Sequence, residues 1–452
     1  MKRNIEDKLK LWKARDDRKP LIIHGARQVG KTFSLKKFGS DEFATVHYLN
    51  FEENETLANI FEGDLNPERI LRDLSFKLKA SIKPATDLLI LDEIQAAPRV
   101  LTSLKYFMEE MPDMAVCAAG SLLGVHMGET SFPVGKVEFM DMFPMSFGEF
   151  LIASGETDAY EFMQTAEKGE ALPEVVHERL WDHFKLYCII GGLPEVVETY
   201  IASKDDLFTT LQRVRERQLA LVTAYHADVA KHAGKLNSMH IERLWRNVPS
   251  QLAREQDASA SRFRFKGIIP GVNRYAKLAG TIDWLIAARL LIRVPIVNKG
   301  AIPLSAYTKE NRFKLYMFDV GILGAVSGIS PGSMLDYDYG SYKGYIAENY
   351  AAQEFLSAGH KNLYGWSEGT AEVEFLCEDN GVILPVEIKS GWVTQAKSLK
   401  VFAEKYAPPY RTVMSGCNMK LSDHGKYHGY PLYLAGRFPL CDERHTKKAP
   451  GK

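Results

Sequence analysis

Residues 21–32 read LIIHGARQVGKT, in which a short apolar strand runs directly into the pattern Gly25-x-x-x-x-Gly30-Lys31-Thr32. Glycines at these two positions allow backbone N–H groups to turn inward around phosphate oxygens. The N-terminus of a helix that follows such a loop adds the positive end of its dipole. The stretch therefore predicts a phosphate-binding loop between a buried strand and a helix.

The loop residues have distinct predicted roles. Lys31 is expected to reach the β- and γ-phosphates of ATP, and Thr32 is expected to ligate Mg²⁺. The helix is expected over residues 33–38 and to be closed by Gly39. The predicted nucleotide-binding residues are Gly25, Ala26, Arg27, Gln28, Val29, Gly30, Lys31 and Thr32.

A second motif supports the first. Residues 88–95 read LLILDEIQ, an apolar strand of the kind that a parallel sheet buried on both faces requires. Asp92, at its carboxyl end, is expected to hold Mg²⁺ directly or through water. Glu93 is then placed to orient or deprotonate an attacking water. The alternative for Glu93 is a solvated loop carboxylate.

The segments between these motifs indicate further strands, at 44–51, 114–121 and within 136–150. Pro98 is expected to open a helix with one apolar face. Ser121, after the strand at 114–121, is expected either to lie beside the γ-phosphate as a sensor of hydrolysis or to cap a helix. Alternating strands and helices predict an α/β fold with a parallel sheet, which binds its ligand at the carboxyl ends of the strands.

Composition places the chain among ordinary globular proteins. Its 452 residues include 57 basic and 57 acidic side chains, and 46% are hydrophobic. No stretch approaches the roughly 18–20 apolar residues that a membrane helix needs. The five cysteines are odd in number and do not have metal-ligand spacing, which is typical of reduced thiols. A cytoplasmic protein without a membrane partner is expected.

The zero net charge hides oppositely charged blocks. Residues 21–210 carry 16 basic and 31 acidic groups, whereas residues 211–300 carry 16 basic and 6 acidic groups. Helical patterns followed by IRVPIV and a turn at 298–300 resemble a winged helix-turn-helix. Such a module could place a helix in the major groove of DNA. Alternatively, it contacts proteins, or its charges neutralise the acidic segment.

The last third contains two strands with carboxylates. In AEVEFLC at 371–377, Glu372 and Glu374 share one face by the period of two. EDNG at 378–381 predicts a hairpin turn, and the return strand VILPVEIKSG carries Glu387 and Lys389 on one face. Upstream, YKGYIAENYAAQEFL places Glu348 on a helix.

This order of a helix glutamate, an acidic strand, a turn and an E-x-K strand resembles the nuclease core of many restriction endonucleases. In such a site two carboxylates would bind Mg²⁺ beside a phosphate, and a lysine would activate water or stabilise developing charge. Glu348, Glu374, Glu387 and Lys389 form this possible nuclease-like site. The alternative is a nuclease-like fold that is used only for binding.

Together the motifs resemble bacterial and archaeal AAA-type ATPases that carry a C-terminal domain of unassigned function and endonuclease-like fold. The resemblance runs from about Leu21 to Gly391. Its carriers are GARQVGKT, LDEIQ, AAGSLL, FPMSFGEFL, GGLPEVVETY, YHADVAKH, FKLYMFDVGIL, GYIAENYAAQEF and EVEFL with LPVEIKSG. The resemblance implies ATP hydrolysis, a homo-oligomer and a connection to DNA.

Two positions depart from the family pattern. The family often has Gly-Arg before the fifth strand, where the arginine can act on a neighbouring site, but this chain has Gly135-Lys136. Lysine cannot form the bidentate fork of arginine. The strand acid of the nuclease-like site is usually aspartate, and here it is Glu374.

Four segments are predicted. Residues 1–20 form a basic N-terminal helix, 21–205 an AAA-type P-loop domain with a helical extension, 206–300 a winged-helix-like module, and 301–452 an endonuclease-like α/β domain. The predicted reaction is Mg²⁺-dependent hydrolysis of ATP by Lys31, Thr32, Asp92, Glu93 and Ser121, driving conformational work on a partner, with DNA favoured. The alternatives are an ATP-gated scaffold with a pseudo-nuclease domain and an ATP-regulated metal-dependent DNA nuclease.

Overall fold

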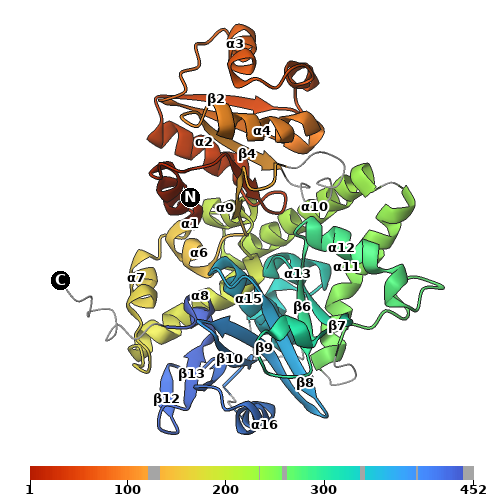
Figure 1. The fold of residues 1–452 in the computed structure, drawn as a ribbon. Helices are drawn as coiled ribbons and strands as arrows, with labels where there is room; N and C mark the ends of the chain where they lie inside the picture. The colour runs from red at the N-terminus through yellow and green to blue at the C-terminus, as the bar shows by residue number, and fades with distance from the viewer. Residues whose placement is uncertain (121–132, 234, 257–261, 336–341, 393–394, 441–452) are drawn as a thin grey trace. The chain divides into compact units, whose positions relative to one another are not determined.

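The chain falls into two compact units (Figure 1). The computed structural model describes residues 1–120, 133–233, 235–256, 262–335, 342–392 and 395–440. Unit 1 comprises Met1–Phe143 with Ala287–Leu290, and unit 2 comprises Pro144–Ile286 with Leu291–Lys452. The N-terminal helix belongs to unit 1, and the predicted boundaries after residues 20, 205 and 300 stay predictions.

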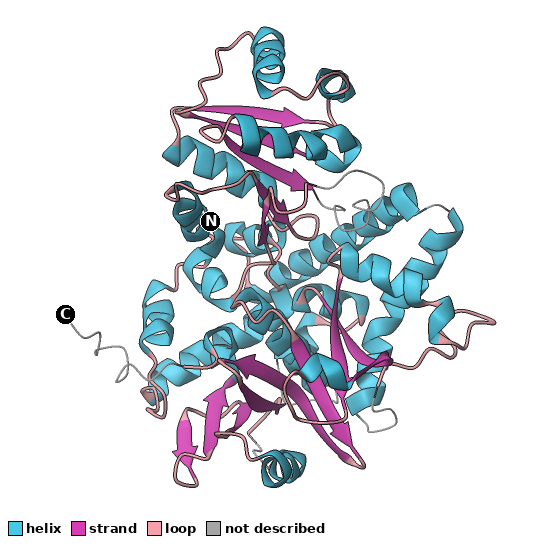
Figure 2. Ribbon diagram, viewed as in Figure 1, coloured by secondary structure: helices cyan, strands magenta, loops and turns pink. Residues whose placement is uncertain are grey.

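Unit 1 is built around a parallel sheet. Its five described strands follow the order β2-β3-β4-β1-β5, and each neighbouring pair is parallel. Its elements are α1 (Asn4–Lys13), β1 (Leu21–His24), α2 (Lys31–Glu42), β2 (Thr45–Asn50), η1 (Glu55–Phe61), α3 (Pro67–Leu78), β3 (Asp87–Asp92), η2 (Ile94–Ala96), α4 (Pro98–Glu110), β4 (Ala115–Gly120) and β5 (Glu138–Asp141). Figure 2 shows helices packed beside these strands. The predicted α/β class and parallel sheet are confirmed.

The apolar segments of the sequence become the buried centre of this sheet. Every residue of β3 and β4 is buried, as a parallel sheet covered on both faces requires. Side chains of α3, α4 and η1 complete one core layer with the strands. Its members include Ile22, Leu49, Leu74, Leu89, Leu91, Val100, Leu104, Phe107 and Val116. The helix predicted from Pro98 onward is confirmed as α4.

The helix after the phosphate-binding loop is longer than predicted. It runs from Lys31 to Glu42, so Gly39 lies inside the helix and does not close it. A Cβ atom at Gly39 would come within 2.6 Å of a Val46 methyl group. The glycine therefore permits close packing of the helix on the sheet, and the expected role as a helix stop is wrong.

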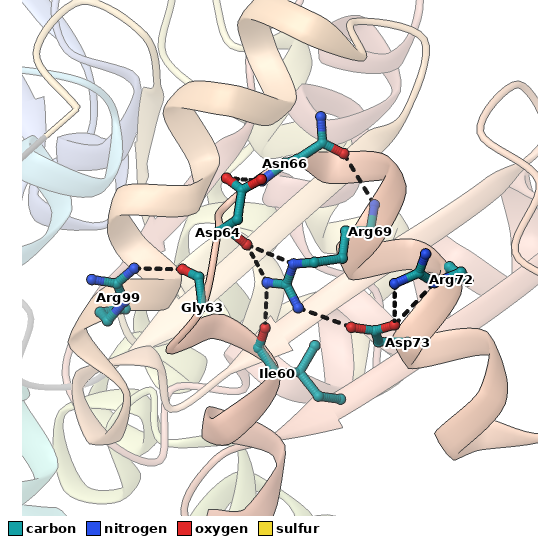
Figure 3. Close-up of polar contacts among 8 residues, drawn as sticks. All are labelled: Ile60, Gly63, Asp64, Asn66, Arg69, Arg72, Asp73 and Arg99. Carbon is teal, nitrogen blue, oxygen red and sulfur yellow. Dashed lines mark hydrogen bonds and ion pairs between the residues drawn. The ribbon is translucent and has the colours of Figure 1, made fainter.

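Two arginines hold the connection between β2 and β3 (Figure 3). Arg69, on α3, donates to the carbonyl oxygen of Ile60 at 2.7 Å and to a carboxylate oxygen of Asp73 at 2.8 Å, and it also contacts the Asp64 carbonyl. Arg99, on α4, donates to the Gly63 carbonyl at 2.7 Å. These bonds satisfy backbone acceptors that regular structure leaves free.

Unit 2 joins a helical region to a mixed sheet. The order of its eight described strands is β12-β13-β11-β10-β9-β8-β6-β7. Its elements are α6 (Phe147–Ala153), α7 (Thr157–Thr165), α8 (Glu174–Ile190), α9 (Pro194–Ala202), α10 (Leu207–Ala233), α11 (Lys235–Gln256), η3 (Tyr275–Lys277), α12 (Ala279–Ala287), β6 (Leu291–Val297), η4 (Leu304–Tyr307), β7 (Thr308–Met317), α13 (Val320–Val326), α14 (Pro331–Leu335), α15 (Tyr342–Ser357), β8 (Leu363–Glu368), β9 (Ala371–Asp379), β10 (Val382–Ile388), α16 (Lys397–Tyr406), β11 (Arg411–Ser415), β12 (Lys420–Ser422), β13 (Tyr427–Pro431) and η5 (Leu432–Arg437).

The segment expected to form a winged-helix-like module contains α10, α11 and α12, followed by β6. The apolar stripe of α11, predicted to be core, is buried at Ile241, Leu244 and Trp245. β6 pairs antiparallel with β7, but it also pairs in parallel with β8. The strand that would be a wing is thus part of the large sheet, and the winged-helix assignment stays a prediction.

The hairpin between β9 and β10 forms at the predicted place. Asn380 and Gly381 both have positive φ angles, 46° and 79°, as a two-residue turn of the favoured hand requires. α16 packs on β9, β10 and β11 through Leu399 and Phe402. The predicted strand–turn–strand element is therefore confirmed, while an endonuclease-like fold stays a prediction.

Candidate nucleotide site and carboxylate cluster

The loop between β1 and α2 has the backbone geometry expected of a phosphate cradle. Gly30 adopts φ 95° and Gln28 φ 63°, so two residues of the loop lie in the left-handed region. A Cβ atom at Gly25 would approach the Met142 carbonyl oxygen to 2.2 Å, so only glycine fits there. Arg3 donates to the Val29 carbonyl at 2.7 Å and fixes the loop from the N-terminal segment.

Lys31 is held inside this loop. Its Nζ donates to the carbonyl oxygens of Gly25 and Ala26 at 2.9 and 2.7 Å, and only 8% of the residue is exposed. Burial lowers the pKa of Lys31 to about 8, although Glu93 and Asp92 act in the opposite direction. Neutral carbonyl groups are its hydrogen-bond partners, so its charge is available to a phosphate.

Thr32 and Asp92 meet beside Lys31. The Thr32 hydroxyl donates to a carboxylate oxygen of Asp92 at 2.7 Å, and the Tyr48 hydroxyl donates to the same oxygen at 3.0 Å. A hydroxyl and a carboxylate are the hard oxygen ligands that Mg²⁺ takes. The predicted metal residues are thus brought together and fit Mg²⁺. The pairing of Tyr48 with Asp92 was not anticipated, although it follows from the parallel register of β2 and β3.

Glu93 directly follows β3 in a left-handed backbone conformation, with φ 52°. Its backbone N–H donates to Asp92 at 3.0 Å, and the Gln95 amide donates to its carboxylate. Among the charged groups that act on Lys31, Glu93 has the largest effect. Glu93 is half-buried, and its role as the catalytic base stays a prediction. We call Lys31, Thr32, Asp92 and Glu93 with the loop the P-loop site.

Two predictions concern neighbouring positions. Ser121 lies outside the described residues, directly after β4, so nothing is known of its side chain. Lys136 forms an ion pair with Glu109 at 2.9 Å. Its charge is therefore partnered inside unit 1.

The sequence patterns did not predict that Arg289 contacts the residue before the phosphate-binding loop. Arg289 donates to an Asp141 carboxylate oxygen at 2.7 Å and lies 3.2 Å from Nδ1 of His24, the residue before Gly25. The pKa of His24 is lowered to about 4, mainly by burial and also by Arg289, while Asp141 opposes both effects. The imidazole is therefore neutral at pH 7. Arg289 is far away in sequence, so only the fold could reveal this contact.

The second predicted set lies in unit 2. Glu348, on α15, accepts from the Tyr316 hydroxyl at 2.7 Å and lies 3.2 Å from Lys314, both on β7. Glu348 is 3% exposed. Neither Lys314 nor Tyr316 was predicted, because β7 is joined to this site only by the folding of the sheet.

Glu374 lies on β9 and Glu387 on the neighbouring strand β10. Glu374 is next in sequence to Phe375 and Glu387 to Val386, and Phe375 and Val386 are opposite each other in the sheet. Burial raises the pKa of Glu374 well above its usual value, and the negative charges of Glu387 and Glu348 raise it further. Burial alone would lower the pKa of Lys389, but the nearby carboxylates raise it overall. We call Glu348, Glu374, Glu387 and Lys389, with Lys314, the carboxylate cluster.

Lys389 donates to one oxygen of Glu387 at 2.7 Å. The other oxygen of this glutamate is buried without a hydrogen-bond partner. Nevertheless, within the described residues no group of three or more histidine, cysteine, aspartate or glutamate side chains is arranged to hold a metal ion. The charges of the four predicted residues act on one another, and a metal at this site stays a prediction.

The parallel sheet of unit 1, with a glycine-containing loop after β1, agrees with the AAA-type P-loop core that the sequence predicted. Residues 17–151 match a protein family described as an AAA domain. Residues 182–333 match a domain of unknown function (DUF8612), and residues 343–433 match a second domain of unknown function (DUF4143). No curated protein matches the chain.

The chain is similar to several solved structures at low sequence identity. The RuvB Holliday junction branch migration motor of Thermotoga maritima is 13% identical, with 65% of this chain and 89% of that chain covered and a TM-score of 0.29. Drosophila ORC bound to DNA is 13% identical, with coverages of 71% and 94% and a TM-score of 0.27. C. elegans PCH-2 is 11% identical, with coverages of 47% and 66% and a TM-score of 0.27. Scores this low do not indicate a shared overall architecture.

The length and apolar character of the helices bear on membrane insertion. In the part of the chain that the structure describes, none of them combines the length and apolar character needed to cross a membrane.

Proposed function

We propose that the chain is a Mg²⁺-dependent ATPase that converts ATP to ADP and phosphate. The observation that carries the proposal is the convergence of Lys31, Thr32 and Asp92 at the carboxyl ends of β1 and β3. A protein that only binds ATP would need the phosphate-binding loop alone. The carboxylate of Glu93, electrostatically coupled to Lys31, adds what hydrolysis requires.

The side chains act as follows. Backbone N–H groups between Gly25 and Thr32 bind the phosphates, and Lys31 exchanges its two carbonyl partners for phosphate oxygens. Mg²⁺ held by Thr32 and Asp92 would neutralise charge on the β- and γ-phosphates. Tyr48 keeps the Asp92 carboxylate in place through its hydrogen bond.

Glu93 orients the attacking water and accepts its proton. The water oxygen forms a bond to the γ-phosphorus as the bond to the bridging oxygen breaks, and ADP leaves with the electron pair. Ser121, following β4, is proposed to sense the γ-phosphate. A homo-oligomer is proposed as the working form, since AAA-type domains complete their sites with a neighbouring subunit's residues.

The decisive experiment separates binding from turnover. Glu93→Gln removes the base but keeps the size of the side chain, so ADP release should fall about 100-fold or more while ATP affinity stays within about twofold. Glu53→Gln is the matched control, because Glu53 is an exposed carboxylate near the same sheet edge. Turnover by Glu93→Gln equal to that of the control would refute the assignment.

The partner is proposed to be DNA, on which the cycle of ATP binding and hydrolysis performs conformational work. The basic block at 211–300 supports the choice through its charge of 16 basic against 6 acidic groups. DNA should raise the rate of ADP release, and the effect should decline steeply with salt. A rate unchanged by DNA at low salt would favour the alternative, an ATP-gated scaffold that recognises a protein.

A second activity, metal-dependent cleavage of DNA, is favoured by one observation. The unpartnered buried oxygen of Glu387 lies beside Lys389, as a metal ligand next to a phosphate-binding lysine would. Cleavage with Mg²⁺ or Mn²⁺ should be lost in Lys389→Ala and kept in Lys361→Ala, an exposed lysine of the same unit. Equal cutting by both variants would place the activity elsewhere or in a contaminant.

A further inference from the structure

A basic groove is lined by residues of α16, β11, β12 and β13 and of the segments next to them; α16, β12 and β13 are labelled in Figure 1. Its cavity has a volume of about 600 Å³. Four of its lining residues are basic, and among the described residues that line it none is acidic. The basic residues are Lys397, Lys400, Arg411 and Lys420. We call these four residues and the cavity the basic groove.

The charges of the basic groove are largely uncompensated. Lys397, Lys400 and Lys420 are exposed, and none of them forms an ion pair with another described residue. Arg411 is the exception, because it pairs with Asp423 at 2.9 Å. Three ammonium groups without an ion-pair partner among the described residues make a strong positive potential, which a recessed low-dielectric surface focuses.

The basic helical segment of the same unit is different. On α10, Arg213 pairs with Asp205 at 2.6 Å and Arg217 with Glu195 at 2.9 Å. On α11, Arg246 pairs with Glu242 at 3.0 Å. Part of the positive charge of residues 211–300 is thus neutralised by ion pairs within the protein. The basic groove is therefore the better local site for an anion.

The backbone of an exposed tryptophan, Trp392, contacts a residue that lines the basic groove. Trp392 is 57% exposed, an unusual state for a large apolar side chain. Its carbonyl oxygen accepts from the Cys417 thiol at 3.3 Å, and Cys417 lines the groove. On one side the indole ring of Trp392 contacts the ring of Trp181, with the two ring centroids 5.6 Å apart. The packing holds the indole in place while more than half of the residue faces solvent.

We propose that the basic groove and Trp392 together bind single-stranded nucleic acid, with phosphates on the lysines and a base stacked on the indole. A positively charged groove beside an exposed aromatic ring is the arrangement that takes unpaired strands. In a duplex the faces of the bases are already stacked and cannot reach the indole. The inference rests on the proposed function only in the choice of nucleic acid as the partner class.

The test measures fluorescence anisotropy of a labelled oligothymidylate with the full chain and without nucleotide. Changing Lys397, Lys400 and Lys420 together to alanine should weaken binding at least tenfold at about 0.1 M salt and reduce the log–log salt slope by about 2. The control changes Lys77, Lys204 and Lys309 to alanine, which removes the same charge from exposed lysines outside the groove. Equal losses in both triple variants would overturn the site.

Trp392 supplies a second, independent readout. Trp392→Ala should weaken oligothymidylate binding by roughly 5- to 150-fold, and Trp392→Tyr should restore most of the affinity, because tyrosine also stacks. Bound oligothymidylate should also protect wild-type tryptophan fluorescence from acrylamide. Affinity unchanged in Trp392→Ala, or a duplex or polyglutamate competing as well as a single strand, would overturn the proposal.

The two proposals fail separately. Binding of oligothymidylate is measured without ATP, so its absence would leave the ATPase proposal standing. Conversely, a wild-type protein that binds oligothymidylate through the basic groove but releases no ADP would refute the ATPase alone.

Discussion

The P-loop site and the carboxylate cluster both place a lysine among carboxylates, but the two lysines are held in opposite ways. Lys31 donates to two backbone carbonyls, and burial lowers its pKa to about 8. Lys389 donates to Glu387, and the surrounding carboxylates raise its pKa. The charge of Lys31 is therefore available to a ligand, whereas that of Lys389 is already neutralised by its neighbours.

A motif predicts which residue types are present. The groups that surround each charge then determine whether that charge can bind a ligand. Lys31 can gain an anion by giving up neutral dipoles. Lys389 could take a phosphate only in competition with Glu387, unless a cation occupied the carboxylates. The following substitutions, in order of decreasing expected effect, test this difference between the two lysines.

The largest effect is expected from Lys31→Ala. The variant removes the one buried cation of the P-loop site, so ADP release should fall by about 100-fold or more and ATP affinity by at least tenfold. Lys77→Ala, on the exposed side of α3, is the control. Equilibrium binding of a fluorescent ATP analogue and an ADP-release assay measure both quantities. Wild-type ATP affinity and ADP release in Lys31→Ala would contradict the claim that the charge of Lys31 is available to ATP.

The lowered pKa of Lys31 predicts opposite trends in affinity and stability. Above pH 8 the ammonium loses its proton in the free protein, so ATP affinity should fall by up to about tenfold per pH unit. The unfolded chain keeps this proton up to about pH 10.5, so the contribution of Lys31 to the unfolding free energy rises between pH 8 and 10.5. ATP titrations at pH 7 to 9.5 test the first trend, and a flat profile would contradict it.

Tyr48→Phe should have an intermediate effect. The variant removes one hydrogen bond to Asp92, a loss of about 1 kcal/mol, or roughly a fivefold increase in the Mg²⁺ concentration needed for half-maximal ADP release. Tyr106→Phe, on α4, is the control with no such bond. If both variants gave the same Mg²⁺ titration, Asp92 would not need Tyr48 for its position.

The smallest effect is expected in the carboxylate cluster. The raised pKa of Glu374 means that folding opposes its ionisation, so its contribution to the unfolding free energy falls as pH rises above 4.5. Glu374→Gln should therefore stabilise the protein by about 1 kcal/mol more at pH 8 than at pH 5. Urea unfolding of this variant and of Glu378→Gln, an exposed neighbour on β9, measures the difference. A destabilising effect at pH 8 would indicate a needed negative charge.

The sequence predicted local motifs well because their geometry is local. Gly25, Gly30 and the strand before them required a cradle, and the structure has it. The turn at Asn380 and Gly381 followed from the same reasoning. Gly39 was misjudged, because the residue that it packs against, Val46, lies on β2 and not on its own helix.

Contacts between distant segments could not be predicted. Arg289 reaches His24 and Asp141 from more than a hundred residues away, and Lys314 reaches Glu348 through the order of the strands. Summed charge was also an incomplete guide, since Arg213 and Arg217 are ion-paired, whereas Lys397 forms no ion pair with any residue that the structure describes. Pairing depends on which elements the fold brings together.

ADP release by the wild-type chain, measured with Mg²⁺ and then with the metal chelated, tests the proposed reaction most directly. Hydrolysis through Thr32, Asp92 and Glu93 predicts steady ADP release with Mg²⁺ and its loss on chelation, with Asp92→Asn lacking release in both conditions. ADP release that is unaffected by chelation, or that persists in Asp92→Asn, would contradict a metal-dependent ATPase at the P-loop site.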